Sequence, residues 1–384
     1  MDFIKRLLTN EVEESLKHFP VVAVTGPRQC GKSTLVRHLL GNKNLVYLDL
    51  ERQSDLRKLD EAEWYLQSQK DKIICLDEIQ RKPELFQLIR SLTDEWGRKG
   101  SFLVLGSASR DLLRQSSESL AGRISYKRLT PFLWSEIKDK GSLEHYLFRG
   151  GFPGSFLSNN NDVSMEWKEN FISTFIERDL MQWTGSSPVS VHRLWQMLSH
   201  VNGQTINYSA LGNSLGLSNT TIKNYMDILQ SVYMVDVVTP HLPNTGKRLI
   251  KAPKVYISDS GIVTGLLGLK GFDQLSGHPV LGSLWEGTVL ANLRGHFPGA
   301  DIRFYRTNHG SELDFLVFVS NKFFAVECKA SKAPVMSRGT YSAINDLKPD
   351  FTFMVSPVDD SYMLRKNTEV VSLSDLIIRI ESTI

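Results

Sequence analysis

The segment at residues 26–34 constrains this chain more than any other, because it reads Gly-Pro-Arg-Gln-Cys-Gly-Lys-Ser-Thr. It matches the Walker A pattern G-x-x-x-x-G-K-[ST] at every constrained position. An apolar run, Pro20–Val24, precedes it, and a helical pattern continues after it from Thr34. This order of strand, loop and helix lets backbone N–H groups and a helix N-terminus face phosphate oxygens. The sequence therefore predicts a site for a nucleoside triphosphate, with ATP and Mg²⁺ as the expected ligands.

Two side chains of this loop have distinct expected roles. Lys32 can reach the β- and γ-phosphates, and the Ser33 hydroxyl can ligate Mg²⁺. The residues expected to contact the nucleotide are Gly26, Pro27, Arg28, Gln29, Cys30, Gly31, Lys32, Ser33 and Thr34.

The composition is that of an ordinary water-soluble protein. The chain has 384 residues, of which 41% are hydrophobic and 23% charged, and its formal net charge is +3. This length is sufficient for two or three domains. A mild net charge neither requires nor excludes a nucleic-acid partner, because local patches matter more than the total. Acidic residues near the N-terminus and the lack of a membrane-length apolar run predict a cytoplasmic protein without a membrane partner.

The first third of the chain alternates apolar runs with spacers that are long enough for helices. Residues 2–18 have the spacing of an amphipathic helix. Strand-forming runs are expected at Pro20–Val24, Asn44–Leu50, Lys72–Leu76 and Ser101–Leu105. Continuous apolar runs are typical of strands buried on both faces of a parallel sheet. The pattern predicts a doubly wound, AAA-like α/β domain over residues 1–135.

Asp77 and Glu78 directly follow the third of these runs, in the position of a Walker B motif. Asp77 is expected to hold Mg²⁺, directly or through water, and Glu78 to act as the general base on the attacking water. Ser107, at the end of the next run, can contact the γ-phosphate or orient that water.

Several motifs together resemble a prokaryotic family of AAA-fold ATPases whose C-terminal domain is related to the PD-(D/E)xK nucleases. The resemblance extends over nearly the whole chain and implies ATP binding and hydrolysis. Besides the phosphate loop, the motifs are Leu76–Gln80, Leu105–Ser109, Ser119–Arg123, Leu129–Phe132, Arg149–Pro153 and Ile176–Leu180.

The resemblance also implies an arginine on the γ-phosphate, in cis or from a neighbouring subunit. Arg123 is the first candidate, followed by Arg110 and Arg178; an ordinary surface ion pair is the alternative for each. An arginine that acts in trans requires a homo-oligomer.

The middle region, residues 136–245, is expected to be mainly helical. Ser209–Leu217 and Asn219–Tyr233 have the pattern of a helix–turn–helix within a winged-helix domain. Four residues near the start of the second helix are expected to be exposed, where a recognition helix would meet DNA. A winged helix that serves only as a spacer remains the alternative. The four residues are Asn219, Thr220, Lys223 and Asn224.

Residues 246–384 are expected to form a restriction-endonuclease-like α/β domain, preceded by a linker near Thr239–Pro253. Two strands, Glu312–Val319 and Phe323–Lys329, are joined at Ser320 and Asn321. A connection of two or four residues places Asp314 opposite Glu327, whereas one of three residues places it opposite Cys328, on the other face.

The sequence has the pattern Asp…Glu-x-Lys of the PD-(D/E)xK motif, although Leu313 stands where that motif has proline. The first of these registers would bring its side chains together. Asp314 and Glu327 would hold a metal ion, and Lys329 would orient a water molecule or stabilise developing charge. Glu286, on the helical stretch Leu284–Leu293, would add a third carboxylate. The alternative is an ion pair between Glu327 and Lys329 on a solvated face.

These patterns favour a Mg²⁺-dependent ATPase coupled to a nuclease-like domain that acts on or binds nucleic acid, with DNA favoured over RNA. Two other classes stay open: a nucleotide-controlled switch and an AAA-type remodeller of a protein partner. In both of these the nuclease-like domain would be inactive.

Overall fold

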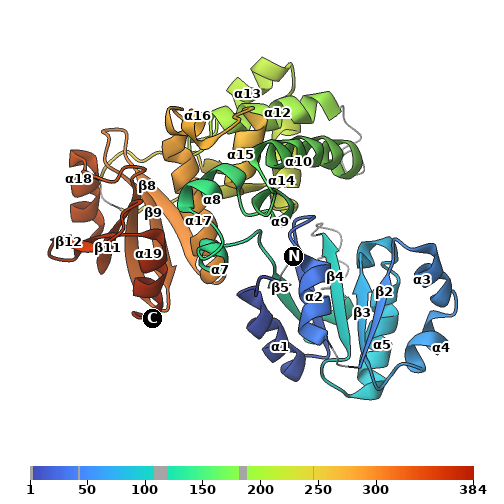
Figure 1. Cartoon of the computed structure of the whole chain (residues 1–384). Coiled ribbons are helices and arrows are strands. Elements are labelled where there is room, and N and C mark those ends of the chain that lie inside the picture. The colour runs from blue at the N-terminus through green and yellow to red at the C-terminus, as the bar shows by residue number, and fades with distance from the viewer. Residues whose placement is uncertain (1–2, 42–43, 108–118, 181–187, 245) are drawn as a thin grey trace. The chain divides into compact units, whose positions relative to one another are not determined.

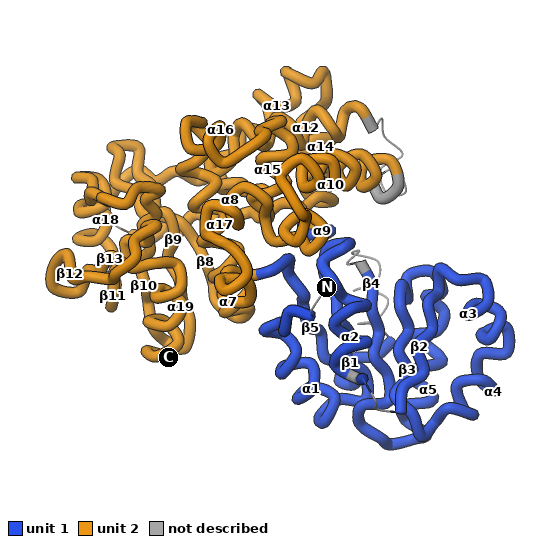
Figure 2. The backbone as a smooth tube through the Cα atoms, viewed as in Figure 1, with its two compact units in different colours: residues 1–132, 231–233 blue, residues 133–230, 234–384 orange. Residues whose placement is uncertain are grey.

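The computed structural model describes residues 3–41, 44–107, 119–180, 188–244 and 246–384 (Figure 1). The chain forms two compact units, shown in separate colours in Figure 2. The first contains Met1–Phe132 and Ser231–Tyr233, and the second contains Leu133–Gln230 and Met234–Ile384. The predicted middle and C-terminal domains thus lie in one unit, and a domain boundary at residues 245–246 stays a prediction.

The first unit is built on a five-stranded sheet in the order β2-β3-β4-β1-β5, and all of its pairs are parallel. Every residue of β1 is buried, as expected for a central strand that is covered on both faces. The α/β fold with a parallel sheet is therefore confirmed. The strands are β1 (Val21–Gly26), β2 (Leu45–Asp49), β3 (Ile73–Asp77), β4 (Phe102–Ser107) and β5 (Ile124–Arg128).

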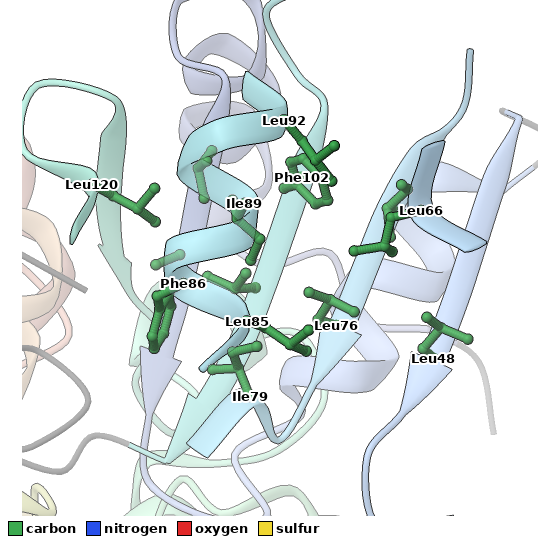
Figure 3. Close-up of a cluster of buried hydrophobic side chains, with 14 of the residues drawn as sticks. Leu48, Leu66, Leu76, Ile79, Leu85, Phe86, Ile89, Leu92, Phe102 and Leu120 are labelled. Carbon is green, nitrogen blue, oxygen red and sulfur yellow. The ribbon is translucent and has the colours of Figure 1, made fainter. Parts of the chain in front are cut away.

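Helix α5 (Leu85–Trp96) shows how the sheet is covered on one face (Figure 3). Its apolar residues recur every three or four positions, so they form a single stripe that packs on the strands. Leu85, Phe86, Ile89 and Leu92 are each at most 1% exposed. Complete burial of such a side chain contributes about 1.5–3 kcal/mol. The other described helices of this unit are α1 (Leu8–His18), α2 (Lys32–Leu40), α3 (Gln53–Lys58), α4 (Ala62–Gln67) and the 3₁₀ turn η1 (Ile79–Arg81).

The second unit contains an eight-stranded mixed sheet in the order β12-β13-β11-β10-β9-β8-β6-β7. Strand β6 comes from the region expected to be a separate middle domain, yet it pairs with both β7 and β8. The strands are β6 (Val235–Pro240), β7 (Lys254–Ile257), β8 (Asp301–Arg306), β9 (Glu312–Val319), β10 (Lys322–Cys328), β11 (Phe351–Val355), β12 (Tyr362–Arg365) and β13 (Thr368–Val371).

Most of the helices of this unit lie in its first half. The expected helical pair is present as α13 (Tyr208–Leu215) and α14 (Asn219–Ser231). Asn207 caps α13 by accepting a hydrogen bond from the Ala210 amide, and Gly216 ends the helix in the left-handed conformation. The other helices are α7 (Trp134–Ile137), α8 (Leu143–Arg149), α9 (Pro153–Phe156), α10 (Asn161–Thr174), the π-helical η2 (Phe175–Leu180), α12 (Pro188–His200), α15 (Ser260–Leu266), α16 (Phe272–Ser276), α17 (Leu281–His296), α18 (Arg338–Leu347) and α19 (Leu373–Glu381).

In the described ranges, no helix combines the length and the apolar composition that a membrane crossing requires. The cytoplasmic location stays a prediction.

Gly26 sets a steric requirement at the end of β1, which gives a first testable prediction. Its φ is 155°, and a Cβ there would lie 2.2 Å from the Leu129 carbonyl oxygen. Gly122 also has a positive φ, 75°, but nothing lies within 4 Å of its Cβ position. Left-handed backbone costs an L-residue about 1–2 kcal/mol. We expect Gly26→Ala to add a steric clash to this cost and to destabilise the first unit more than Gly122→Ala does.

Native-state hydrogen exchange of the β1 amides in urea measures the effect, because it reports on the first unit alone. Equal protection in the two variants would show that the Leu129 carbonyl moves aside and would contradict the prediction.

Candidate nucleotide-binding site and carboxylate cluster

The phosphate loop joins β1 to α2 with the backbone geometry that its sequence predicts. Gln29 and Gly31 both have positive φ, 59° and 99°, and α2 begins directly after Gly31. Such a turn directs successive N–H groups and the helix N-terminus toward the same place. Gln29 and Thr34 are exposed, whereas Pro27 and Cys30 are buried beneath the loop.

Lys32 and Ser33, in the first turn of α2, bind different groups. The Lys32 ammonium donates to the carbonyl oxygens of Gly26 (3.1 Å) and Pro27 (2.8 Å), so its charge is held over the loop. The Ser33 hydroxyl donates to the Asp77 carboxylate at 2.7 Å. The Walker A serine and the Walker B aspartate are therefore in contact, although 44 residues separate them.

Asp77 has a further neighbour that the sequence did not indicate. The Tyr47 hydroxyl, from β2, donates to the same Asp77 oxygen as Ser33. Burial raises the pKa of Tyr47, so its hydroxyl stays protonated and remains a donor. The Arg37 guanidinium lies 4.7 Å from the centre of the Tyr47 ring. A tyrosine in a strand carries no pattern that would have identified this role.

Glu78 follows Asp77 in an uncommon backbone conformation. Its φ of 57° and ψ of 46° lie in the left-handed region, which non-glycine residues rarely occupy. Such residues cluster at functional sites, where the surrounding structure maintains the strain. The Gln80 amide donates to the Glu78 carboxylate and orients it.

Arg6 forms hydrogen bonds with the phosphate loop and with the segment after β5. The sequence pattern did not indicate this role. Its guanidinium donates to the carbonyl oxygens of Cys30 (3.0 Å), Thr130 (2.6 Å) and Pro131 (3.2 Å). Arg6 is only 4% exposed. Three carbonyl oxygens bound by one buried cation fix the phosphate loop against the segment that follows β5.

Arg123 lies far from the phosphate loop of its own chain. The Arg123 carbonyl accepts a hydrogen bond from the Val21 amide, at the start of β1, whereas the loop follows the other end of that strand. Five residue steps of β1 separate these ends by about 17 Å. The Arg123 guanidinium instead binds both oxygens of Asp94, at 2.6 and 2.9 Å. A contact with the nucleotide of a neighbouring subunit stays a prediction.

The other candidates near the γ-phosphate fall partly or wholly outside the described structure. Arg110 lies outside the described residues. Only the backbone is described for Ser107, in β4, and for Arg178, in η2. Their expected roles stay predictions.

In the second unit, the hairpin of β9 and β10 has the register that brings the carboxylates together. The strands are joined by Ser320 and Asn321, both with positive φ (47° and 61°), as in a two-residue type I′ turn. Val319 pairs with Lys322, and Phe315 with Val326. Continued by one residue, this register sets Asp314 opposite Glu327 on one face, and the charge of Asp314 does act on Glu327.

Glu327 lies in a buried environment rather than on a solvated face. It is 5% exposed, and its Oε1 accepts hydrogen bonds from Lys329 Nζ (2.7 Å) and Thr340 Oγ1 (3.0 Å). Its other oxygen, Oε2, is buried and has no hydrogen-bond partner in the described structure. Burial, together with the nearby Asp314 charge, raises the pKa of Glu327 to about 7.

Lys254, the first residue of β7, places an ammonium group among three carboxylates. Its Nζ lies 3.0 Å from Glu312, 3.3 Å from Asp314 and 3.6 Å from Glu286. Burial alone would lower the pKa of Lys254, but these carboxylates raise it above its ordinary value. A lysine at the start of the apolar run Val255–Ile257 was the only sign of this role in the sequence.

Glu286 extends from α17 into the same cluster, as its helical spacing predicted. Its Oε2 accepts a hydrogen bond of 2.8 Å from the Tyr256 hydroxyl. Burial and the charge of Asp314 raise the pKa of Glu286 to about 8, while Lys254 opposes the shift. We call Lys254, Glu286, Glu312, Asp314, Glu327 and Lys329 the carboxylate cluster.

The two sites differ in how well their residues suit a cation. Ser33 and Asp77 offer a hydroxyl and a carboxylate beside a phosphate loop, which suits Mg²⁺. In the carboxylate cluster, the buried Glu327 Oε2, which has no hydrogen-bond partner in the described ranges, suits a cation, but Lys254 already supplies positive charge to Asp314. Among the residues described, no group of three or more His, Cys, Asp or Glu is arranged to hold a metal ion.

A buried strand, a phosphate loop and a serine that meets the Walker B aspartate define a P-loop ATPase. Residues 18–138 match the family model described as "AAA domain". The first unit is therefore an AAA-type P-loop ATPase domain. Residues 140–273 and 281–376 match two models that are each described as a domain of unknown function, DUF8612 and DUF4143.

Two mycobacterial relatives match almost the whole chain. They are uncharacterized proteins of Mycobacterium tuberculosis and Mycobacterium bovis, each 36% identical over 369 residues. Each match covers 95% of this chain and 83% of the relative. The chain belongs to the same family as these two proteins.

The solved structures that match part of this chain include the following two. One is the Walker-type ATPase of Pyrococcus abyssi, with 17% identity and a TM-score of 0.49 over 69% of this chain and 96% of that one. The other is the RuvB Holliday junction branch migration motor of Thermotoga maritima, with 16% identity and a TM-score of 0.30 over 62% and 91% of the chains.

The raised pKa of Glu286 predicts a pH dependence of stability. The ordinary value is 4.5 and the value in the folded unit is about 8, so the folded state holds this proton more tightly than the unfolded chain. The contribution of this proton to the free energy of unfolding is fully present below about pH 4.5, and it is lost as the pH rises through 8. Glutamine is neutral throughout, so we expect Glu286→Gln to reduce the loss of stability between pH 5 and pH 8.5, by on the order of 1.4 kcal/mol per pKa unit.

Urea unfolding of the second unit at both pH values measures this difference. Asp360→Asn, at an exposed carboxylate of the same unit, is the matched control and should unfold like the wild type. A pH dependence in Glu286→Gln as steep as that of the wild type would contradict the prediction.

Proposed function

We propose that the first unit binds ATP together with Mg²⁺ and hydrolyses it. The contact between Ser33 and Asp77 carries this proposal, because it brings a hydroxyl and a carboxylate to the edge of the sheet where the phosphate loop begins. Ser33 and Asp77 would hold Mg²⁺, which neutralises phosphate charge when it is bound. The Lys32 ammonium, held over the loop by two carbonyl oxygens, stabilises charge on the β- and γ-phosphates.

Glu78 is the proposed general base for ATP hydrolysis. Its carboxylate accepts a proton from the attacking water, and its left-handed backbone conformation is of the strained kind that clusters at functional sites. Gln80 holds the Glu78 carboxylate through a side-chain hydrogen bond and is a positioning residue.

Two substitutions separate binding from hydrolysis. Lys32→Ala removes the phosphate-binding ammonium, so we expect ATP binding to be lost. Glu78→Gln keeps the shape but cannot accept a proton, so we expect ATP to bind normally and hydrolysis to fall by about 10²–10⁴-fold. Binding of a fluorescent ATP analogue and release of phosphate measure the two effects.

Glu84→Gln is the matched control, because Glu84 is an exposed carboxylate shortly after the same strand. Hydrolysis by Glu78→Gln at the rate of this control would contradict the role of Glu78.

We further propose that the second unit acts on nucleic acid, with Mg²⁺-dependent cleavage of phosphodiester bonds at the carboxylate cluster. The support is the register of β9 and β10, whose continuation sets Asp314 opposite Glu327, together with the hydrogen bond from Lys329 to Glu327. Asp314 and Glu327 would hold the metal ion, which lowers the pKa of a bound water when it is present. The Lys329 ammonium, 2.7 Å from Glu327, can stabilise charge that develops on the phosphate.

The order of elements around α14 supports DNA as the nucleic acid. Three helices, α12, α13 and α14, are followed by the antiparallel pair β6 and β7, and Thr205 forms a bridge with Lys254 of β7. This is the order that a winged-helix domain requires. The four predicted recognition residues are exposed on the first turns of α14: Asn219, Thr220, Lys223 and Asn224.

A second function is favoured by the position of Lys254. Its ammonium lies among Glu286, Glu312 and Asp314, where it supplies the positive charge that a metal ion would otherwise bring. In this alternative, the second unit binds a nucleic-acid or protein partner without cleavage, and ATP controls that binding. Homo-oligomerisation with Arg123 acting in trans is compatible with either function.

A cleavage assay decides between the two. We expect the wild type to cut DNA in Mg²⁺ and Glu327→Gln to lose at least about 10²-fold in rate, because a ligand of the ion is neutralised. Lys32→Ala should retain the Mg²⁺-dependent cutting, since the cluster lies in the other unit. Asp360→Asn is the carboxylate control. Absence of cutting on DNA and RNA, with and without ATP, would favour the alternative.

A further inference from the structure

A pocket of about 1030 Å³ lies in the second unit, between the helical pair and the segment that precedes β7. One wall is formed by the residues that lead into α13 and by the first turns of α14. The other wall is Lys247–Ala252, together with Leu242 and Asn308. We call it the basic pocket; it lies apart from the residues of the carboxylate cluster.

All the charged side chains that line the basic pocket are positive. Its lining contains the cations Lys223, Lys247, Arg248 and Lys251, and no carboxylate. Lys247 is paired with Asp346 (2.6 Å), which is not part of the lining. Within the described ranges, no ion pair is found for the other three, and all three are exposed. A concave surface with several unpaired cations attracts a polyanion.

The remaining lining residues suit a nucleic-acid strand better than an acidic peptide. The Tyr208 ring lies beside the pocket, with Lys223 Nζ 5.6 Å from its centre. Asn219 and Asn308 add amide groups that can bind base edges or sugars. Cations combined with an aromatic ring and amides are typical of surfaces that bind single strands, on which bases stack. The volume is close to the upper limit of small-ligand pockets, so it holds a few nucleotides of one strand rather than a duplex.

Backbone hydrogen bonds connect the basic pocket to the carboxylate cluster. Leu249 forms a bridge with Thr307, and the Ile250 amide donates to the Arg306 carbonyl at 3.0 Å. Arg306 in turn pairs with Glu312, a member of the cluster. Lys251 precedes Lys254 by three residues, which span at most about 11 Å. A strand in the pocket therefore lies within a few nucleotides of Asp314.

We propose that the basic pocket holds the sugar–phosphate backbone of a single-stranded nucleic acid and leads that strand to the carboxylate cluster. This inference rests on the proposed action on nucleic acid, and it assigns the binding residues that the cluster itself lacks. Arg248 and Lys251 contact phosphates, and Tyr208 stacks with a base.

Binding is measured by fluorescence anisotropy with a labelled single strand of DNA of about 20 nucleotides, longer than the site. The Glu327→Gln protein is used so that nothing is cut. We expect the double substitution Arg248→Ala with Lys251→Ala to weaken binding at least about ten-fold, and to reduce the slope of log affinity against log salt by about 1.4, for two lost phosphate contacts on a single strand. Lys270→Ala with Lys366→Ala removes two exposed cations elsewhere in the unit and is the control.

Three further ligands test the identity of the occupant. RNA of the same sequence should respond to the pocket substitutions as DNA does, because the contacts are to the backbone. Binding of duplex DNA that falls equally in the double variant would overturn the assignment to a single strand. Polyglutamate that competes as well as DNA would show that the pocket recognises charge alone, which would also overturn it.

The outcomes separate this inference from the proposed function. Unchanged affinity and salt slope in the double variant, with DNA still bound, would overturn the pocket and leave the function in place. Loss of binding in the double variant, with no cutting by the wild type, would support the pocket and contradict the nuclease. Absence of binding to every nucleic acid would overturn both.

Discussion

The parallel direction of the strands in the first unit is the constraint on which the nucleotide site depends. Strand β4 lies between β1 and β3, and all three run the same way. Their carboxyl ends therefore meet at one edge, where β1 continues into the phosphate loop and β3 ends at Asp77. Reversal of β3 would move Asp77 to the other edge, and reversal of β1 would move the phosphate loop there; either change would separate Asp77 from Ser33.

Each unit contains a buried cation that binds several oxygen atoms, but the kinds of oxygen differ. Arg6 binds three carbonyl oxygens and fixes the phosphate loop against the segment that follows β5. Lys254 instead balances the charges of Glu312 and Asp314, and it opposes the rise in the pKa of Glu286. Removal of either cation would leave buried polar groups without partners, which costs more than the net gain from forming such contacts.

The two units divide the proposed activity between them. The first has the residues for ATP binding and hydrolysis and matches a model of AAA domains. The second has the carboxylate cluster, the helical pair and the basic pocket in one compact body. The two mycobacterial relatives match 95% of this chain, so each of them matches both units. This favours a function in which ATP hydrolysis controls what the second unit does.

The sequence alone determined the features that are local in the chain. The phosphate loop, the Asp77–Glu78 pair, four of the five strands of the first sheet and the helical pair follow from spacings of a few residues, and these were confirmed as structural elements. Strand β5 was not predicted. The sequence left the register of β9 and β10 open, because a change of one residue in the turn moves Asp314 to the other face. Only the tertiary structure decided that register, through the left-handed conformations of Ser320 and Asn321. It also decided that Lys254 meets Asp314, 60 residues away, because packing of the sheet rather than spacing along the chain brings such residues together.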